Sequence, residues 1–332
     1  MRSTLAAIFF AAVLLVVLAV ATSWAPDRPV ETLTERWATP PSQFLPLQGM
    51  AVHLRDEGWA DDPLPVLLLH GTSSSLHTWD GWVGALSPSR RVIRVDLPGF
   101  GLTGPFPHDD YHVTAYVTFV LELLDSLDLS QVVIAGNSFG GQLAWETAVT
   151  APERVAALIL VDAAGYPLEP KSVPIGFRIA QNDWLQPLVT HLLPRRLVAG
   201  SVHDVYGDPD RVSDALLDRY YELALRAGNR RALGLRLEQA IHHEARAARI
   251  ATITQPTLIL WGEYDQLIPP ENAARFAADI GGSRLVIFDG LGHVPHEEDP
   301  EATVVEAMRF LDWLTEKRAG RAAATRLRPA RH

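Results

Sequence analysis

The fold of this chain is decided by one stretch, residues 132–142, which reads VVIAGNSFGGQ. It opens with a continuous apolar run, turns sharply through the pattern G-x-S-x-G, and leads into a helical pattern. A serine on such a turn leaves no room for side chains where strand and helix approach each other, which explains the glycines at 136 and 140. The stretch therefore predicts a strand, a tight turn and a helix, with Ser138 exposed at the edge of a sheet as a candidate nucleophile.

Further apolar runs bounded by turn residues lie along the chain. Several are continuous rather than alternating, as expected for strands that are buried on both faces of a mainly parallel sheet. The runs are residues 50–54, 66–69, 92–95, 132–135, 157–161, 257–260 and 285–288. Helical patterns lie between them, and this alternation predicts an α/β fold with right-handed crossovers, whose site lies at the carboxyl ends of the strands.

The same patterns divide the chain into segments. Residues 49–165 and 251–317 carry the strands and form the predicted core, whereas residues 166–250 show helical patterns without a convincing strand between them. Helices inserted between two strands predict a cap over the site, whose aromatic residues either line a pocket or form the cap's own core. Residues 25–48 are rich in Pro, Thr and charge and are predicted to be a linker, and residues 318–332 a basic flexible tail.

The N-terminal segment, residues 1–24, predicts export. Arg2 precedes an unbroken apolar run, residues 5–21, whose length lies between a signal-peptide core and a membrane-spanning helix. Trp24 and the proline two residues later favour a retained anchor, whereas Ala-Val-Ala at 19–21 fits a cleaved signal. We favour the anchor. In both cases retention of positive charge inside predicts a membrane-anchored or secreted protein, with its domain on the periplasmic or extracytoplasmic side.

Composition excludes several classes of function. The 332 residues carry a formal net charge of −10 without a clustered basic face in the body of the chain, which argues against a nucleic-acid partner. The chain has no cysteine, which excludes disulfides, thiolate nucleophiles and cysteine metal sites. No phosphate loop, nicotinamide fingerprint or metal-ligand cluster is apparent in the sequence, so we expect no cofactor and no metal. The predicted partner is a small-molecule substrate.

A serine nucleophile needs a base from elsewhere in the chain, and His293 is the best candidate. It follows the last apparent strand in the glycine-lined loop 290–295, GLGHVP, which would lie at the same sheet edge as Ser138. His296, just after this loop, is expected to be a solvated histidine.

The acid that orients His293 should follow an earlier strand, and two aspartates do so. Asp265 lies in the loop after residues 257–260, and Asp162 ends the run 157–161. We favour Asp265 over Asp162, and over Glu263 in its own loop, which is more typical of a surface charge.

The oxyanion of a transition state needs donors that are already in place. The backbone N–H of Phe139 is one candidate, because it follows the nucleophile at the start of a helix. Thr72 is the other, because it follows His70-Gly71 at the end of the run 66–69, in the equivalent loop of the neighbouring strand.

With these pieces in order, the chain resembles the α/β-hydrolase superfamily, in the branch that has a helical cap after the sixth strand. The resemblance covers roughly residues 49–317 and rests on the motifs HGT (70–72), DLPGFG (96–101), GNSFG (136–140), WGEYD (261–265) and GHVP (292–295). It implies the α/β-hydrolase fold, a mainly parallel eight-stranded sheet flanked by helices. It also implies these roles: Ser138 as nucleophile, Asp265 as acid, His293 as base, and the backbone amides of Thr72 and Phe139 as oxyanion donors.

Within that superfamily the sequence favours some activities over others. Haloalkane dehalogenases and epoxide hydrolases are similar but carry aspartate where this chain has Ser138. Hydrolases of carbon–carbon bonds in ring-cleavage products usually have a glycine-rich oxyanion loop and an arginine after the acid, where this chain has TSSS (72–75) and Gln266. We therefore expect a serine hydrolase that cleaves carboxylic esters of small to medium apolar substrates through an acyl-enzyme. The alternatives are a C–C bond hydrolase of ring-cleavage products and a non-catalytic, capped ligand-binding relative.

Overall fold

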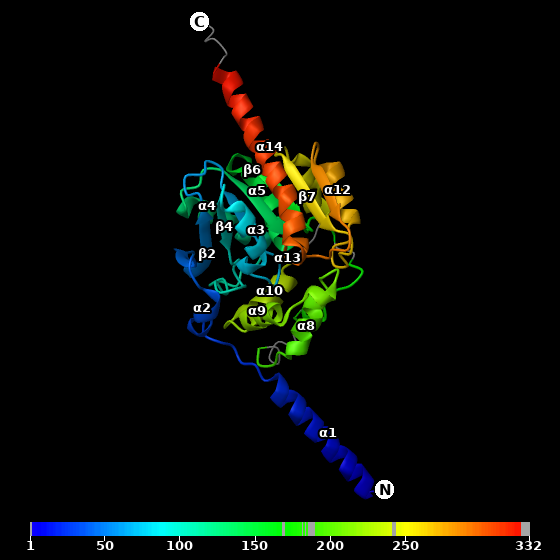
Figure 1. Ribbon diagram of the computed structural model, residues 1–332. Helices are drawn as coiled ribbons and strands as arrows, with labels where there is room; N and C mark the ends of the chain where they lie inside the picture. Colours follow the sequence, from blue (N-terminus) through cyan, green and yellow to red (C-terminus); the bar gives the residue numbers. More distant parts are fainter. Residues whose placement is uncertain are drawn as a thin grey trace.

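The computed structural model describes residues 2–167, 170–180, 182, 184, 190–240 and 244–326 (Figure 1). Its centre is one eight-stranded sheet with the order β1-β2-β4-β3-β5-β6-β7-β8. Strands β1 and β2 are antiparallel, β2 is antiparallel to β4, and all strands from β3 to β8 run parallel to their neighbours. The predicted mainly parallel sheet of eight strands is confirmed.

The central strands are buried along their whole length, which accounts for their continuous apolar sequences. The strands are β1 (Gln43–Leu47), β2 (Met50–Gly58), β3 (Val66–Leu69), β4 (Arg91–Val95), β5 (Val132–Asn137), β6 (Val155–Val161), β7 (Thr257–Gly262) and β8 (Arg284–Phe288).

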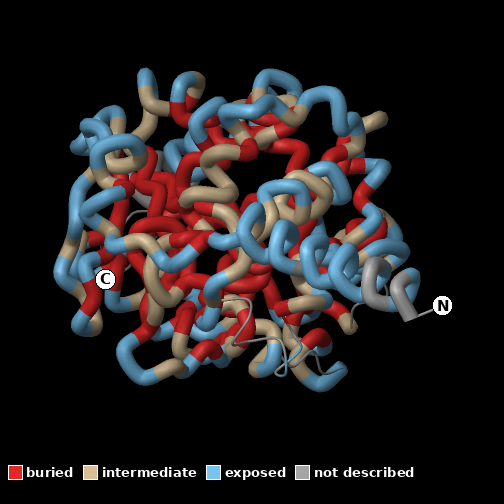
Figure 2. Tube along the Cα trace, turned by 90° about the horizontal axis from the view of Figure 1, so that it is seen from below, coloured by how far each residue is buried: buried red, intermediate tan, exposed pale blue. Residues whose placement is uncertain are grey.

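Helices cover both faces of the sheet. One apolar core includes residues of α4 (Val113–Ser126), α5 (Phe139–Thr150) and α12 (Glu271–Asp279). A second core includes residues of α3 (Asp80–Leu86) and α14 (Pro300–Arg326). The shorter elements of this part of the chain are η1 (Leu76–Trp79), η2 (Pro152–Arg154) and α13 (Pro295–Glu298). Seen from below, buried segments fill the centre of the molecule and exposed segments surround them (Figure 2).

The chain between β6 and β7 is helical where the structure describes it. Its elements are α6 (Ile175–Ala180), α8 (Arg195–His203), η4 (Pro209–Arg211), α9 (Asp214–Ala224), α10 (Asn229–Glu238), α11 (Glu244–Ala247) and η5 (Ala248–Thr252). Helices α8, α9 and α10 form a layer beside the sheet, on the side from which α1 extends (Figure 1). Val202, Tyr206 and Leu217 pack together there with Val294 of the core.

The segment predicted as a linker is folded onto the domain instead. It contains α2 (Glu31–Trp37) and β1, so the sheet begins at Gln43 rather than near Gly49. Leu33 is buried against Leu102 and Leu223, and Trp37 Nε1 donates to Glu222 Oε2 at 2.7 Å. The few apolar residues of this proline-rich stretch are thus used for packing, which composition does not reveal.

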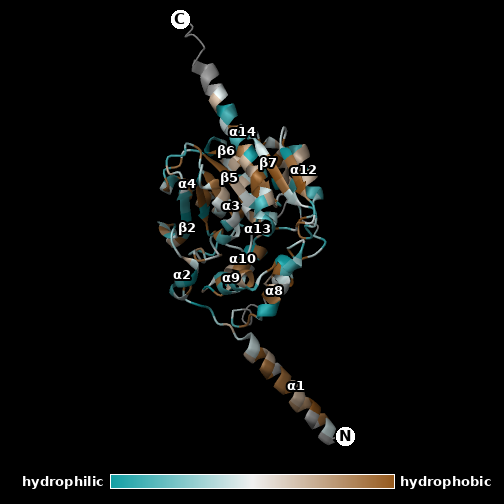
Figure 3. Ribbon diagram, viewed as in Figure 1, coloured by the Kyte–Doolittle hydropathy of each residue, from teal (hydrophilic) through white to brown (hydrophobic). Residues whose placement is uncertain are grey.

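Helix α1 (Arg2–Ser23) extends away from the body of the protein (Figure 1) and is apolar along most of its length (Figure 3). Phe9, Phe10 and Leu14 are exposed. Within the described part of the chain, no helix combines the length and apolar character needed to cross a membrane. The N-terminal anchor or export signal stays a prediction.

Helix α14 continues to Arg326, well into the segment predicted to be a flexible tail. Alanine and arginine, which are abundant after Lys317, are both good helix formers, so the helix has no local reason to end there. Residues 327–332 of the predicted tail lie outside the described part of the chain.

Candidate active site

Ser138 lies at the turn between β5 and α5, in a backbone conformation that ordinary residues avoid, with φ +55° and ψ −116°. A side chain at Gly140 would overlap the carbonyl oxygens of Leu69 and His70, and one at Gly136 would overlap the backbone of Gly140. The two glycines therefore permit the close approach of β5, α5 and β3. This packing holds the serine above the carboxyl end of the sheet.

His293 and Asp265 are brought together by the loops after β8 and β7. His293 Nδ1 lies 2.7 Å from Asp265 Oδ2, and both side chains are almost fully buried. The other carboxylate oxygen of Asp265 accepts hydrogen bonds from the backbone N–H groups of Leu267 and Ile268, at 2.8 and 2.9 Å. These bonds fix the carboxylate, which in turn fixes the orientation of the imidazole ring.

The backbone of His293 is also tied to the nucleophile turn. Asn137, which precedes Ser138, donates from Nδ2 to the carbonyl oxygen of His293 at 2.9 Å. The N–H of His293 donates to the carbonyl of Val205 in the cap, at 2.8 Å. Ser138 and His293 border the same cavity.

Asp162, the alternative acid, lies at the same edge of the sheet but in a different role. Its Oδ1 accepts a hydrogen bond from the N–H of Gly262 at 2.9 Å. Its fully buried Oδ2 has no hydrogen-bond partner among the described residues. Burial, followed by the neighbouring Asp265 carboxylate, raises the pKa of Asp162 well above its ordinary value. These effects favour the protonated form of Asp162, which can donate a hydrogen bond to Asp265.

Asp162, Asp265 and His293 are also the group of possible metal ligands in the described chain, with ligand atoms within 4.8 Å of one another. The Nδ1 atom of His293 is already engaged by Asp265 at hydrogen-bond distance. A protonated Asp162 is a poor ligand for a cation. The donor set therefore fits a hydrogen-bonded triad better than a metal centre.

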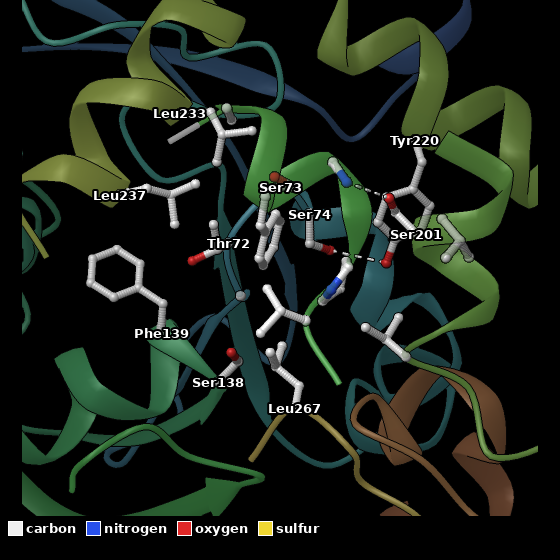
Figure 4. Close-up of a pocket in the computed structure, with 18 of the residues that line it drawn as sticks. Thr72, Ser73, Ser74, Ser138, Phe139, Ser201, Tyr220, Leu233, Leu237 and Leu267 are labelled. Atoms are coloured by element: carbon white, nitrogen blue, oxygen red, sulfur yellow. Dashed lines mark hydrogen bonds between the residues drawn. The ribbon is translucent and has the colours of Figure 1, made fainter. Parts of the chain in front are cut away.

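Thr72 lies beside the nucleophile because the loop after β3 touches the turn after β5. A side chain at Gly71 would lie 2.9 Å from Asn137 Oδ1 and 3.0 Å from Ser138 Cβ. His70 holds this loop in place, because its Nε2 accepts a hydrogen bond from the N–H of Leu97 at 2.9 Å. Burial lowers the pKa of His70, which favours the neutral ring that can accept this bond. Thr72, Ser138 and Phe139 border one cavity (Figure 4). The residues of the two predicted oxyanion donors thus border the same cavity as the serine.

The cavity has a volume of about 460 Å³ and lies between the core and the cap. Its walls are mainly apolar side chains of the cap, including Phe177, Leu197, Val202 and Leu233, which face Leu267 of the core. Such a volume suits a small or medium organic molecule. Tyr220 lines the cavity, whereas its neighbour Tyr221 is not among the lining residues.

A family model described as alpha/beta hydrolase fold matches residues 65–300. The chain belongs to this family. It is 32% identical to the 2-hydroxy-6-oxo-2,4-heptadienoate hydrolase of Pseudomonas putida over 259 residues, which cover 74% of this chain and 87% of that enzyme.

Two solved structures have the same fold as this chain. The meta-cleavage product hydrolase of Pseudomonas fluorescens IP01 is 25% identical, with a TM-score of 0.68 over 82% of this chain and 97% of that one. A putative lipase of Acinetobacter baumannii is 22% identical, with a TM-score of 0.72 over 88% and 98%.

Several residues around the site of this hydrolase were missed or misjudged from sequence. His296 was expected to be solvated, but it is fully buried, with Nε2 3.1 Å from Thr78 Oγ1 and its ring against Trp79. The expectation was wrong because His296 lies in α13, and its side chain packs against Thr78 and Trp79 instead of facing solvent. Glu298 was not singled out.

Glu298 joins the histidine loop to the cap in this hydrolase. Its carboxylate accepts the N–H groups of Gly292, Gly207 and Asp208, at 2.8, 3.0 and 2.8 Å. A second link is the buried ion pair of Arg219 with Glu297, which also accepts the hydroxyl of Tyr220 at 2.7 Å. A glutamate pair within PHEE (295–298) was the available signal, but its partners lie in the cap, which sequence periodicity does not place.

Proposed function

We propose that this protein is a serine hydrolase that cleaves carboxylic esters of small to medium apolar substrates. The observation that carries this proposal is the mainly apolar cavity of about 460 Å³ bordered by both Ser138 and His293. Such a cavity can bind an apolar acyl group while its carbonyl carbon meets the serine.

The chemistry follows from the roles of the residues in the site. The Oγ of Ser138 attacks the ester carbonyl while His293 takes the hydroxyl proton of Ser138. The backbone N–H groups of Thr72 and Phe139 stabilise the oxyanion that forms. The intermediate collapses to an acyl-enzyme when the alkoxide leaves with the proton from His293. Water, deprotonated by His293, then attacks the acyl-enzyme and releases the carboxylic acid and the free serine.

The second candidate is hydrolysis of a carbon–carbon bond in a ring-cleavage product. The observation that favours it is the similarity to the 2-hydroxy-6-oxo-2,4-heptadienoate hydrolase and to the 2-hydroxymuconate semialdehyde hydrolase of a Pseudomonas strain, 29% identical over 254 residues. The polar TSSS loop and Gln266 favour the ester reaction over this one.

The test is to measure kcat/KM for p-nitrophenyl esters of increasing acyl length beside a 2-hydroxy-6-oxo dienoate. We expect ester turnover that depends on Ser138 and exceeds dienoate turnover. Faster cleavage of the dienoate would replace the ester proposal by the second candidate. Failure of a fluorophosphonate to label the serine would instead support a non-catalytic ligand-binding protein.

We also propose that residues 1–24 direct export and attach the protein to a membrane. The exposed apolar side chains of α1 support this, because such a surface is unfavourable in water. Fractionation should place the full-length protein with the membranes, with its domain accessible to protease from outside. A mature N-terminus at Thr22, found by mass spectrometry, would show a cleaved signal instead.

A further inference from the structure

Arg236 lies in the wall of the cavity that Ser138 borders. It comes from α10 of the cap and is 4% exposed. Its guanidinium carbon is 3.7 Å from the centre of the Phe139 ring, the side chain of the residue directly after the nucleophile. A full positive charge is therefore buried close to the reacting centre.

This charge has no acidic partner among the residues that the structure describes. Its Nε is buried without a hydrogen-bond acceptor, and none of the carboxylates in the described part of the chain forms an ion pair with the guanidinium. The other three buried arginines of the described chain each lie near a carboxylate: Arg55 near Asp80 at 3.8 Å, Arg94 near Glu57 at 2.8 Å and Arg230 near Asp27 at 2.6 Å. Arg236 differs from all of them.

Burial lowers the pKa of Arg236 to about 10, so the side chain remains protonated at neutral pH. A buried cation without a partner is costly, and the face of the Phe139 ring offsets part of this cost. The ring cannot accept hydrogen bonds from the five N–H groups of a guanidinium as a carboxylate does. The cavity therefore contains unused donors for an anion.

The ligand has to match both parts of the cavity. Most of the wall is apolar, and the second lining arginine, Arg230, is already bound to Asp27 through both Nε and Nη2. A planar carboxylate can take two parallel hydrogen bonds from the guanidinium of Arg236, which has no acidic partner among the described residues.

We propose that Arg236 binds a carboxylate that the substrate carries in addition to the bond that is cleaved. The preferred substrates are then half-esters of apolar dicarboxylic acids. This inference rests on the proposed hydrolase function and names its substrate class. Arg236 acts in recognition, whereas Ser138 and His293 act in bond cleavage.

The first experiment measures binding without turnover. Hexanoate and hexanamide, which differ in charge but have the same chain length, are titrated into the Ser138→Ala protein by calorimetry. We expect hexanoate to bind at least about tenfold more tightly, because a charge-assisted pair replaces a neutral contact. Equal affinities would overturn the inference. The preference for hexanoate should also disappear in Ser138→Ala/Arg236→Met, which keeps the oxyanion donors of Thr72 and Phe139. An unchanged preference in that protein would overturn the inference as well.

The second experiment compares kcat/KM for the p-nitrophenyl half-ester of adipic acid with that for p-nitrophenyl hexanoate. The ratio of the two values should fall about tenfold to a hundredfold in Arg236→Met and by less in Arg236→Lys. A ratio cancels any general loss of activity. Arg231→Met removes a charge from the exposed side of the same helix, where Arg231 pairs with Asp109, and should leave the ratio unchanged. An unchanged ratio in Arg236→Met would overturn the inference.

The two experiments separate the inference from the proposed function. If neither ester is hydrolysed but hexanoate binds more tightly than hexanamide only when Arg236 is present, the anion site stands and the ester hydrolase proposal fails. If both esters are hydrolysed but the two ligands bind equally, the hydrolase proposal stands and the role of Arg236 is wrong.

Discussion

Asp162 and Asp265 lie side by side at the carboxyl ends of β6 and β7, and Asp265 is the one that holds His293, through a 2.7 Å contact between Oδ2 and Nδ1. Asp162 instead accepts the N–H of Gly262. Two carboxyl groups in one buried site are most stable with a single negative charge. Burial and the neighbouring carboxylate therefore favour the protonated form of Asp162.

Replacing Asp265 by asparagine should reduce kcat on the order of 10⁴-fold, because an amide no longer stabilises the imidazolium or selects its tautomer. Asp162→Asn is the matched control, since an asparagine can still donate to Asp265 as the protonated acid does. It should keep activity within about tenfold of wild type. Steady-state kinetics on one ester compares the two variants. The assignment is wrong if Asp162→Asn loses most activity while Asp265→Asn stays within that range.

The raised pKa of Asp162 predicts a pH-dependent stability. The unfolded chain releases this proton near pH 4, whereas the folded protein retains it to higher pH, so the free energy of unfolding should fall as the pH rises above that value. Asp162→Asn removes the titrating group and should make the pH dependence shallower over the same range. Denaturant unfolding of both proteins between pH 5 and pH 8, a range set by the ordinary aspartate value, measures the difference. Parallel curves would contradict the prediction.

Glu298 should contribute to both stability and catalysis. Glu298→Ala leaves three backbone N–H groups without their charged acceptor and should lower the free energy of unfolding by roughly 2 to 4 kcal/mol. It should also lower kcat, because Gly292 is the neighbour of His293. Glu301→Ala, an exposed change in the first turn of α14, is the control and should be nearly neutral. Retention of wild-type stability and turnover in Glu298→Ala would show that the histidine loop is held by other contacts.

The serine turn depends on glycine at position 140. Gly140→Ala should destabilise the protein by roughly 3 kcal/mol or more, because the new methyl group overlaps the carbonyl oxygens of Leu69 and His70. Gly84→Ala in α3 is the contrast. No atom lies within 4 Å of its new methyl group, and alanine favours a helix by about 1 kcal/mol over glycine, so this variant should be at least as stable as wild type. Thermal unfolding of both variants distinguishes the two effects.

The parts that sequence predicted well are those whose signal is local. The strand, turn and helix around Ser138 are contiguous, and the loop of Asp265 directly follows its strand, so neither required knowledge of distant contacts. The burial of His296 and the packing of Leu33 against the cap depend on residues far away in the chain. Arg236 gave no signal in the sequence, because an arginine on a helix is normally a surface residue. What sets it apart is its burial without an acidic partner among the described residues.

The central claim is that Ser138 is the nucleophile and that His293 activates it. The most direct test is to react the protein with a fluorophosphonate and to locate the adduct by peptide mass spectrometry. We predict one stoichiometric adduct on Ser138, none in Ser138→Ala, and labelling that is slower by orders of magnitude in His293→Ala. An adduct on another residue, or undiminished labelling in His293→Ala, would contradict the account.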